Sequence, residues 1–575
     1  MPMVDSTRRS LLIGAGLTAA SALVVPRRGS AAIDATAAAP GADILPLIDQ
    51  ERARILSIMK KDDVPGAAVC LLHEGKAVWV EGFGVTDLKS NRRIGTGTIF
   101  SIQSTSKNFT AVAVLLAVQR GLLDLDKPIT AYLPEFRVRS RFESAPQEKM
   151  TLRLLLSHRA GFTHEAPVGN NYDPFFPDFE AHIRSISSTW LRYPVGERYR
   201  YSNLGIDLAG YILQRAAASP FAECLKNTIF DPLGMGDSTA ETGEYARRAD
   251  RAVGHAKGYA AVPLKTPLIP SGGVYTSARD MIGYLAFHLG RGAVGGKTLL
   301  QPALWEEMHS FSLGGDYGLG IIRTELRYGD TPVRMLGHKG GGFGFGCVCN
   351  YCPEAQLAWV ALFNRQTGAP YQFGAELLDN LLVRRYGPRR PRQPATDLAP
   401  IQLQTPQLEA FTGNYAGRAA AAQIKRADGV LGMQVGATFT PLHFTSPVDM
   451  FLVDPEGETV GYRYFAQMTG EPAHLECSVG ENSLDYNDGP NDPPGPNLAA
   501  WEAYIGRYEV DLWGKRSDEF SIHRKNGYLY LNELRLIVEI EPGLFFAADG
   551  EALDLRSAPT WRNIRLRRIS AKTTG

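Results

Sequence analysis

The chain has 575 residues, and its 61 Lys and Arg nearly balance its 60 Asp and Glu, for a formal net charge of +1. This length predicts about two to four domains, and a hydrophobic content of 44% excludes disorder over most of the chain. The balanced charge argues against a dedicated nucleic-acid binder, which needs a basic excess to neutralise phosphates. Six cysteines are too few for a disulfide-built scaffold.

Residues 1–32 are predicted to be a twin-arginine-type export signal. Arg8 and Arg9 precede an apolar run that ends at Val25, and small residues follow it. This order is typical of a cleaved signal peptide. The apolar run is short for a membrane span, which needs roughly 20 residues; the alternative is a retained N-terminal anchor. We therefore expect an exported protein, periplasmic or secreted, with no stable membrane span after signal removal.

Two proline-rich segments divide the rest of the chain. Residues 387–394 and 487–496 carry several prolines each and cannot continue a helix or a central strand. They predict one large unit over residues 45–386 and two small units, over residues 400–488 and 497–573.

The two small units share a sequence octet. Residues 408–415 read LEAFTGNY and residues 501–508 read WEAYIGRY. Short alternating stretches bounded by turn residues follow each octet, which predicts two small antiparallel β domains, barrels or sandwiches. We interpret the pair as a duplication, with chance similarity over eight residues as the alternative.

The large unit mixes strand and helix patterns. Its predicted elements are a strand–turn–strand over residues 69–80 with its turn at 73–76, helices over 108–119, 206–217 and 278–289, and a strand over 357–363. Strands at both ends with helices between them predict an α+β domain whose sheet closes late in the chain.

The first candidate site motif is Ser104-Thr105-Ser106-Lys107. A serine hydroxyl is a weak nucleophile that needs a base or a neighbouring cation. Positions i and i+3 share a helix face, so Lys107 can reach the Ser104 oxygen. The same spacing occurs at Ser57 and Lys60, where we expect an ordinary solvated helix face. Ser104 differs because an apolar, strand-like segment precedes it and a buried-looking helix follows it.

Two further motifs complete the candidate site. Tyr201 precedes Asn203; a tyrosine with a reference pKa of about 10 becomes a usable base when an ammonium such as that of Lys107 lies beside it. Asn203 is a candidate donor of an amide hydrogen bond to substrate. The glycine-rich stretch that begins at His338 offers a strand edge whose N–H groups can stabilise an oxyanion, with Gly340 and Gly341 allowing close approach. Taken alone, each of these motifs also fits an ordinary turn.

The ordered set Ser-x-x-Lys, Tyr-x-Asn and His-x-Gly resembles the penicillin-recognising serine hydrolases, which include class C β-lactamases, D-specific peptidases and related esterases. Two supporting segments, residues 155–162 and 271–280, are similar to that family's leucine-leucine-threonine-histidine and glycine-glycine stretches. The resemblance covers roughly residues 45–386. It implies an antiparallel sheet flanked by helices, with a helical subdomain.

The resemblance also implies a role for each site residue. Ser104 is the acylated nucleophile, Lys107 its activator and Tyr201 the proton shuttle. The backbone N–H groups of Ser104 and Gly341 form the oxyanion hole. Asn203 lines the pocket, as do His338 and Gly340 of the third motif.

One position departs from many members of the family, which carry lysine where His338 stands and use it to hold a substrate carboxylate. Histidine, with a reference pKa of about 6.5, is mostly neutral near pH 7, so carboxylate recognition should be weaker. A histidine at this position, together with two appended β domains, looks most like D-aminopeptidase, a family whose β domains are lipocalin-like. Lys339 should point to the opposite face of the strand.

Other chemistries find little support in the sequence. There is no Gly-x-Ser-x-Gly elbow, His-Glu-x-x-His helix or P-loop. Cys347, Cys349 and Cys352 do not have a standard zinc spacing, and we expect buried structural cysteines, with a disulfide among them as the alternative. We therefore expect neither a metal nor a cofactor.

We predict a serine hydrolase that acts through an acyl-enzyme on a small peptide, amide or ester, preferably a D-amino-acid peptide or amide. An esterase and a weak β-lactamase are the enzymatic alternatives. A non-catalytic sensor of cell-wall fragments or penicillin is the alternative from another class. A homodimer is compatible with the sequence.

Overall fold

The computed structural model describes most of the chain beyond the predicted export signal, which lies outside the described residues. The described residues are 44–569, except 171–177, 257–268, 314–315, 391–399, 418–420, 456, 458, 468–471, 478–483, 491 and 513–514. Within these ranges no helix is long and apolar enough to cross a membrane.

The large unit is built on an antiparallel sheet whose described strands run in the order β11-β7-β8-β9-β10-β1-β2. Their bounds are β1 Gly66–His73, β2 Lys76–Gly84, β7 Ile322–Tyr328, β8 Thr331–Gly342, β9 Phe345–Cys352, β10 Leu357–Phe363 and β11 Arg389–Arg390. The predicted hairpin is confirmed, since His73 pairs with Lys76. The predicted strand over 357–363 is confirmed as β10, which pairs with β1 and so closes the sheet late in the chain.

Helices surround this sheet. Their bounds are α1 Leu45–Lys61, α2 Ser106–Gln119, α3 Leu152–Leu156, α4 Phe179–Ile186, α5 Asn203–Ala217, α6 Phe221–Leu225, α7 Thr242–Arg247, α8 Ile269–Gly272, α9 Met281–Leu289, α10 Pro302–Met308 and α11 Ala375–Tyr386. The three predicted helices are confirmed as α2, α5 and α9. Two short ladders, β3 Ile99–Ser101 with β4 Tyr275–Ser277 and β5 Ala293–Val294 with β6 Lys297–Thr298, lie outside the main sheet.

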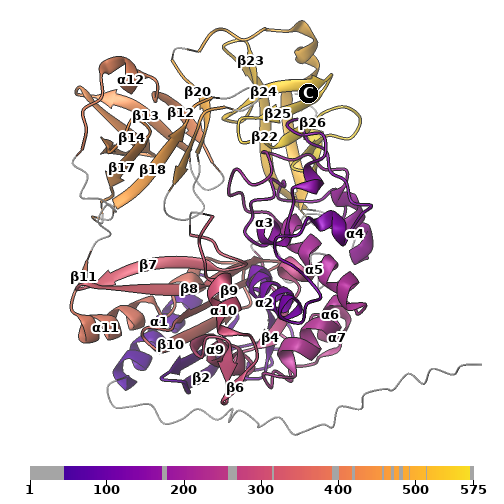
Figure 1. Ribbon diagram of the computed structural model, residues 1–575, viewed down its shortest axis with the longest axis vertical. Coiled ribbons are helices and arrows are strands. Elements are labelled where there is room, and N and C mark those ends of the chain that lie inside the picture. Colours follow the sequence, from indigo (N-terminus) through magenta and orange to yellow (C-terminus); the bar gives the residue numbers. More distant parts are fainter. Residues whose placement is uncertain are drawn as a thin grey trace, which may run out of the picture.

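Strand β1 shows why the large unit has helices on both faces of its sheet. Its residues are almost all buried, so its side chains alternate between two apolar clusters. Ala68, Cys70 and Leu72 belong to the cluster that includes α2, α5 and α9. The intervening residues belong to the cluster formed with α1 and α11. The result is the predicted α+β architecture, with α3 to α7 gathered to one side of the sheet (Figure 1).

Two antiparallel β units follow the large unit, as predicted, and stand side by side above it in Figure 1. The described strands of the first run in the order β15-β14-β13-β12-β20-β19-β18-β17-β16, and those of the second close into a barrel. The first unit comprises α12 Thr405–Glu409, β12 Gly413–Ala416, β13 Ala421–Ala427, β14 Val430–Val435, β15 Thr438–Pro441, β16 His443–Phe444, β17 Asp449–Val453, β18 Thr459–Phe465, β19 His474–Cys477 and β20 Leu484–Asp488. The barrel comprises β21 Gly506–Leu512, β22 Lys515–Lys525, β23 Tyr528–Leu531, β24 Leu534–Glu541, β25 Leu544–Ala547, β26 Ala552–Asp554, β27 Thr560–Trp561 and β28 Ile564–Ile569.

The two related octets have the same local structure. Each places a helical turn before the first long strand of its unit and a glycine at the junction, Gly413 with φ 156° and Gly506 with φ 157°. In each, a buried tyrosine donates its hydroxyl hydrogen to the carbonyl four residues earlier: Tyr415 to Phe411 and Tyr508 to Tyr504, both at 2.8 Å. This shared geometry supports the interpretation of the two units as a duplication.

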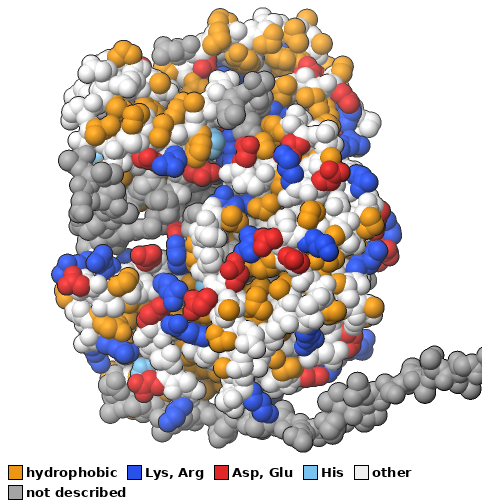
Figure 2. Space-filling view, in the orientation of Figure 1, with side chains coloured by type: hydrophobic (Ala, Val, Ile, Leu, Met, Phe, Trp, Pro, Cys, Tyr) orange, Lys and Arg blue, Asp and Glu red, His pale blue; other side chains and the backbone are white. Residues whose placement is uncertain are grey.

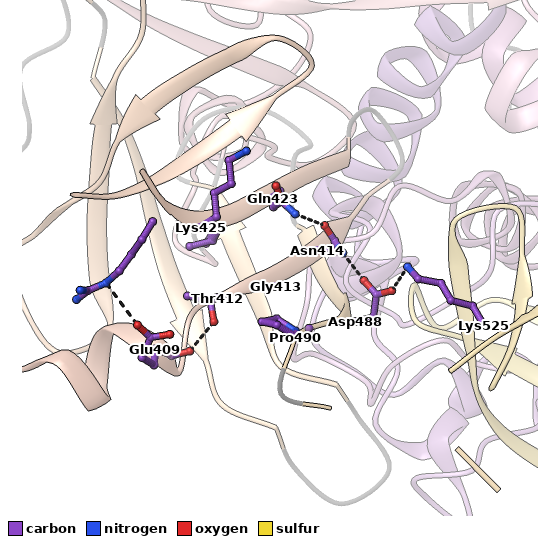
Figure 3. Close-up of a pocket in the computed structure, with 12 residues that line it drawn as sticks. Glu409, Thr412, Gly413, Asn414, Gln423, Lys425, Asp488, Pro490 and Lys525 are labelled. Atoms are coloured by element: carbon purple, nitrogen blue, oxygen red, sulfur yellow. Dashed lines mark hydrogen bonds and ion pairs between the residues drawn. The ribbon is translucent and has the colours of Figure 1, made fainter. Parts of the chain in front are cut away.

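The two β units are joined to each other at Asp488 (Figure 3). Its carboxylate accepts hydrogen bonds from Asn414 of the first unit and from Lys525 of the barrel, both at 2.5 Å. Tyr530 of the barrel donates to the same carboxylate at 3.1 Å. A cavity of about 450 Å³ lies beside this junction. On the face shown in Figure 2, basic and acidic side chains are interspersed over the large unit, in keeping with the nearly neutral net charge.

Candidate active site

Ser104 lies in a short turn between a strand and a buried helix. The 3-10 turn Gln103–Thr105 follows β3 and leads directly into α2. Gln103 has a φ of 49°, which is uncommon for a residue with a side chain, and its side-chain amide donates to Ser101 Oγ at 2.7 Å. This arrangement leaves Ser104 partly exposed on a rigid turn while its neighbours are buried.

Lys107 lies in the first turn of α2 and is fully buried. Its Nζ lies 3.0 Å from Ser104 Oγ, 2.9 Å from Asn203 Oδ1 and 3.0 Å from the carbonyl oxygen of Ser271. Three acceptors match the three N–H donors of an ammonium group. The geometry therefore suits a charged Lys107 that donates to the serine oxygen rather than one that takes its proton.

A buried polar chain fixes the carbonyl that holds Lys107. The backbone N–H of Ser271 donates to Asp207 Oδ1 at 2.8 Å, and Asp207 Oδ2 lies 3.1 Å from His182 Nε2. Burial opposes charge on His182, but its hydrogen bond to Asp207 and the charge of that carboxylate leave the pKa of the imidazole raised overall. Asp207 is fully buried, so this chain is insulated from solvent.

Tyr201 immediately precedes the N-cap of α5. Its ring lies over the Lys107 ammonium, with 4.8 Å between Nζ and the ring centroid. Ser202 caps the helix by accepting from the N–H of Leu204 at 3.1 Å, and Asn203 is its first helical residue. The second motif is thus brought to the first by the start of α5. The Asn203 side-chain oxygen holds Lys107, which leaves its NH₂ group as the donor for substrate.

The third motif lies on the open end of β8. Strand β7 pairs with β8 only as far as Gly337, while β9 continues to Gly342, so residues 338–342 have a neighbour on one side. A Cβ on Gly340 would lie 2.1 Å from the carbonyl oxygen of Ile102, so glycine allows β8 to approach the Ser104 turn. A Cβ on Gly341 would lie 2.7 Å from the hydroxyl of Tyr371. The strand edge expected from the sequence is therefore present at this end of β8.

His338 is buried beside this edge. Its Nε2 lies 2.9 Å from the hydroxyl of Tyr317, and its Nδ1 lies 2.6 Å from the carbonyl oxygen of Lys339. Burial and the nearby charge of Lys107 lower the pKa of His338 to about 3, so the ring is neutral near pH 7. Lys339 points to the exposed face, as expected, with its Nζ 5.4 Å from the Tyr371 ring centroid.

Four residues at the site were not assigned site roles from the sequence. His158 packs its ring 4.4 Å from that of Tyr201, and its Nδ1 accepts from the Ser202 N–H at 3.2 Å. His164 lies 5.9 Å from the Tyr201 ring, with its Nδ1 2.8 Å from Glu165. Tyr317 and Ser271 are the others. His158 and Ser271 occur in the supporting segments used for the family resemblance; no sequence signal marks Tyr317 or His164.

The cysteine cluster lies next to the site but has no sign of site chemistry. Cys347, Cys349 and Cys352 are buried on β9 as free thiols, which confirms the structural reading and contradicts the disulfide alternative. Burial raises the pKa of the Cys347 and Cys352 thiols to about 12, so neither is a thiolate. Among the described residues no group of His, Cys, Asp or Glu side chains is arranged to hold a metal ion.

Relatives in sequence match parts of the chain. Esterase EstB of Burkholderia gladioli is 30% identical over 183 residues, which are 30% of this chain and 46% of EstB. Protein flp of Staphylococcus aureus (strain COL) is 24% identical over 235 residues, 40% of this chain and 47% of flp. The matched part thus spans about half the length of these curated relatives.

Solved structures match more of the chain. SurE superposes with a TM-score of 0.53 at 21% identity, over 76% of this chain and 98% of SurE. SurE has also been solved with D-Leu. At this identity the likeness concerns the fold.

The match to a whole family is broader than any of these relatives. The family described as Beta-lactamase matches residues 52–383, more than half of the chain. This range contains the Ser104, Tyr201 and His338 motifs and the whole helical part that carries them. The chain therefore belongs to the β-lactamase-fold family of serine hydrolases.

Proposed function

We propose that the protein hydrolyses amide or ester bonds through an acyl-enzyme on Ser104, with D-amino-acid peptides or amides as the preferred substrates. The observation that carries the proposal is the contact of Lys107 Nζ with Ser104 Oγ beneath the ring of Tyr201. Since Ser104 Oγ accepts a hydrogen bond from Lys107, its own proton can be donated to the Tyr201 phenolate as the oxygen attacks a carbonyl. Tyr201 then returns the proton to the leaving amine or alcohol.

The open edge of β8 supplies the second half of the mechanism. The N–H of Gly341 lies on this edge, and with the N–H of Ser104 it is the proposed oxyanion hole. One such donor contributes about 3–4 kcal/mol in the transition state. The carbonyl carbon of the substrate is thereby activated without a cofactor step.

The charge distribution around the site favours an amine-bearing substrate over a carboxylate-bearing one. His338 is neutral and engaged with Tyr317, so it offers no cation to a carboxylate. On the other side of Tyr201, the ring of His164 is one hydrogen bond from the buried carboxylate of Glu165. Negative charge here suits a free N-terminal ammonium. The D-Leu seen with SurE belongs to that protein, and it adds leucine amides to the substrates worth testing.

A mechanism-based serine probe tests the acyl-enzyme. A fluorophosphonate should add its mass to the wild-type protein at Ser104 and leave Ser104→Ala unlabelled. Tyr201→Phe keeps the ring packing and removes the proposed proton acceptor, so it should be labelled on the order of 10²-fold more slowly. An unlabelled wild-type protein would indicate a non-catalytic sensor instead.

Substrate preference is tested on the same preparation. Turnover of the p-nitroanilides of D-alanine and D-leucine is compared with that of their L-enantiomers, of p-nitrophenyl butyrate and of a chromogenic cephalosporin. The proposal expects the D-anilides to be cleaved fastest among the amides. Turnover of the ester alone would favour the second candidate, an esterase, for which the 30% identity with EstB speaks. Fast cephalosporin turnover would favour a β-lactamase.

A further inference from the structure

The segment that carries Tyr201 has no regular secondary structure between Leu191 and α5. It is laid against residues 158–161 by backbone hydrogen bonds: the N–H groups of Arg192, Gly196 and Arg200 donate to Gly161, Arg159 and His158, each at 2.8 Å. These bonds leave the side chains of Arg192, Arg198 and Arg200 buried, with exposed fractions of 5%, 3% and 8%. Buried guanidinium groups need anionic partners, because desolvation of an unpaired charge is costly.

The first β unit provides one partner. Asp485 on β20 is 1% exposed, and its carboxylate accepts from Arg198 at 3.1 Å and from Arg200 at 2.9 and 3.0 Å. The contact with Arg200 is bidentate, which fixes orientation as well as distance. Arg200 is the residue immediately before Tyr201, so the first β unit holds the chain one residue from the proposed base.

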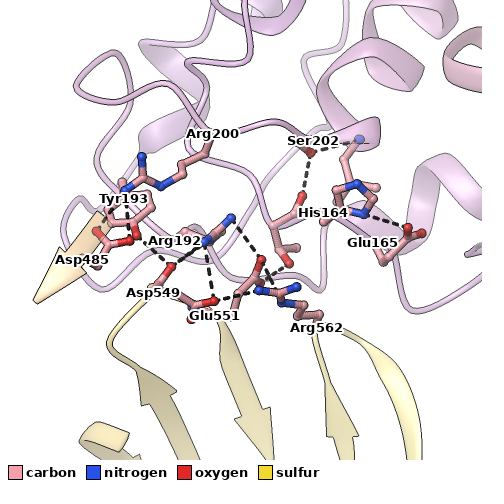
Figure 4. A network of polar contacts seen from close by, with 12 residues as sticks. His164, Glu165, Arg192, Tyr193, Arg200, Ser202, Asp485, Asp549, Glu551 and Arg562 are labelled. Atoms are coloured by element: carbon pink, nitrogen blue, oxygen red, sulfur yellow. Dashed lines mark hydrogen bonds and ion pairs between the residues drawn. The ribbon is translucent and has the colours of Figure 1, made fainter. Parts of the chain in front are cut away.

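The barrel provides the others (Figure 4). The turn between β25 and β26 carries Asp549 and Glu551. Arg192 donates to the Asp549 carbonyl at 2.5 and 3.1 Å and lies 3.2 Å from the Glu551 carboxylate. Gly550 approaches closely, since a Cβ there would lie 2.8 Å from the Arg192 carbonyl oxygen. The barrel therefore holds the start of the segment that ends at Tyr201.

A second connection from the barrel reaches the other side of Tyr201. The hydroxyl of Thr163 donates to Glu551, and the Thr163 carbonyl accepts from Ser202 Oγ at 2.6 Å. Ser202 is the N-cap of α5 and follows Tyr201 directly. Between the two anchored ends, the rings of Arg198 and Arg200 guanidinium partner Tyr193 link both contacts: the guanidinium carbons lie 4.3 and 4.6 Å from its ring, and its hydroxyl donates to the Asp549 carbonyl at 2.7 Å.

We propose that Asp485 and Glu551, one from each β unit, are positioning residues that hold residues 192–202 so that the Tyr201 phenol stays beside Lys107 and Ser104. The two β units act together because Asp488 joins them. They thus serve the chemistry of the large unit at a distance from the reacting atoms. This inference rests on the proposed function, since it needs Ser104 to be acylated.

The test uses the full chain and two readouts. Asp485→Asn and Thr163→Val are compared with the wild-type protein for kcat and KM on p-nitrophenyl butyrate and for the rate of fluorophosphonate labelling. Both should lower kcat and labelling roughly 10-fold or more with KM unchanged, because a misplacement of about 1 Å costs on the order of 10²-fold. Asp485→Glu keeps the carboxylate and should recover most of the lost rate.

Controls separate positioning from general weakening of the fold. Asp449→Asn removes a carboxylate from another arginine pair in the first β unit, that with Arg463, and should leave both rates at the wild-type level. Wild-type rates for folded Asp485→Asn and Thr163→Val, as judged by circular dichroism and melting temperature, would overturn the inference while leaving the proposed function intact. If Asp485→Asn does not fold, Thr163→Val decides alone, because it removes one hydroxyl. An unlabelled wild-type protein would instead refute the proposed function.

Discussion

Two helices of this chain carry the same Ser-x-x-Lys spacing, and they differ in everything around it. Ser57 and Lys60 lie on α1 with both side chains exposed. Ser104 and Lys107 lie at the start of α2, where Lys107 is fully buried and in contact with the serine oxygen. Spacing alone brings a lysine to the right face of a helix. What distinguishes the second pair is that distant segments supply further acceptors for the same ammonium.

Replacing the two serines should give the largest contrast. Ser104→Ala removes the nucleophile and should lower kcat on any substrate found by at least about 10³-fold, since loss of a catalytic serine costs more than that in comparable hydrolases. Ser57→Ala removes an exposed hydroxyl and should leave kcat unchanged. Measuring both variants with one substrate checks the pair. Equal effects would mean that the spacing, and not the surroundings, was misread.

Replacing the two lysines should give the next largest effect. Lys107→Met keeps the length of the side chain but removes the donor to Ser104, and we expect a loss of roughly 10²-fold or more in kcat. It also leaves buried acceptors at Asn203 and Ser271 unsatisfied, at a cost of about 1–3 kcal/mol in the free energy of unfolding. Lys60→Met should change neither quantity. Activity and urea denaturation measured side by side provide the check.

Local features of this architecture could be predicted from the sequence because they depend on neighbouring residues. The apolar run of β10, the turn between β1 and β2 and the start of α5 all follow from pattern and turn chemistry. The site residues Ser104, Lys107 and Tyr201 could be proposed because their ordered motifs are specific as a set. The three side chains lie together in the structure.

Other contacts could not be predicted, for identifiable physical reasons. The Ser271 atom that holds Lys107 is a backbone carbonyl, and any residue type supplies one. Tyr317 reaches His338 across 21 positions with no motif around it. Asp485 pairs with Arg200 across 285 positions, between different units. Such contacts follow from tertiary packing, which residue spacing does not encode.

A third prediction concerns the close approach of β8 to the Ser104 turn. Gly340→Ala places a Cβ against the Ile102 carbonyl and should push β8 away, lowering the free energy of unfolding by about 1–3 kcal/mol and slowing acylation. Gly95→Ala is the matched control, because a Cβ at Gly95 meets nothing within 4 Å. Thermal melts and fluorophosphonate labelling measure the two consequences. A variant at Gly340 as stable and as fast as the one at Gly95 would contradict this account of the turn.

The smallest effect concerns the acid side of the stability profile, where the buried surroundings of Lys107 should be felt by His338. Its pKa falls from about 6.5 in the unfolded chain to about 3 in the folded one. Between these values the unfolded state binds more protons, so the free energy of unfolding decreases as the pH falls from about 6.5 towards 3. One such group accounts for at most about 1.4 kcal/mol per pH unit.

His338→Asn removes this group, so its stability should fall less steeply than that of the wild-type protein over the same pH range. His309 and His474, whose pKa values are lowered by burial to about 3 and about 2, remain in both proteins and do not affect the difference. Urea denaturation at several pH values between 4 and 7 measures both slopes. Because Lys107 and Lys339 both oppose a charge on His338, equal slopes would mean that the imidazole is not held neutral beside the ammonium. The contrast between the buried and the exposed Ser-x-x-Lys pair would then lose its electrostatic basis.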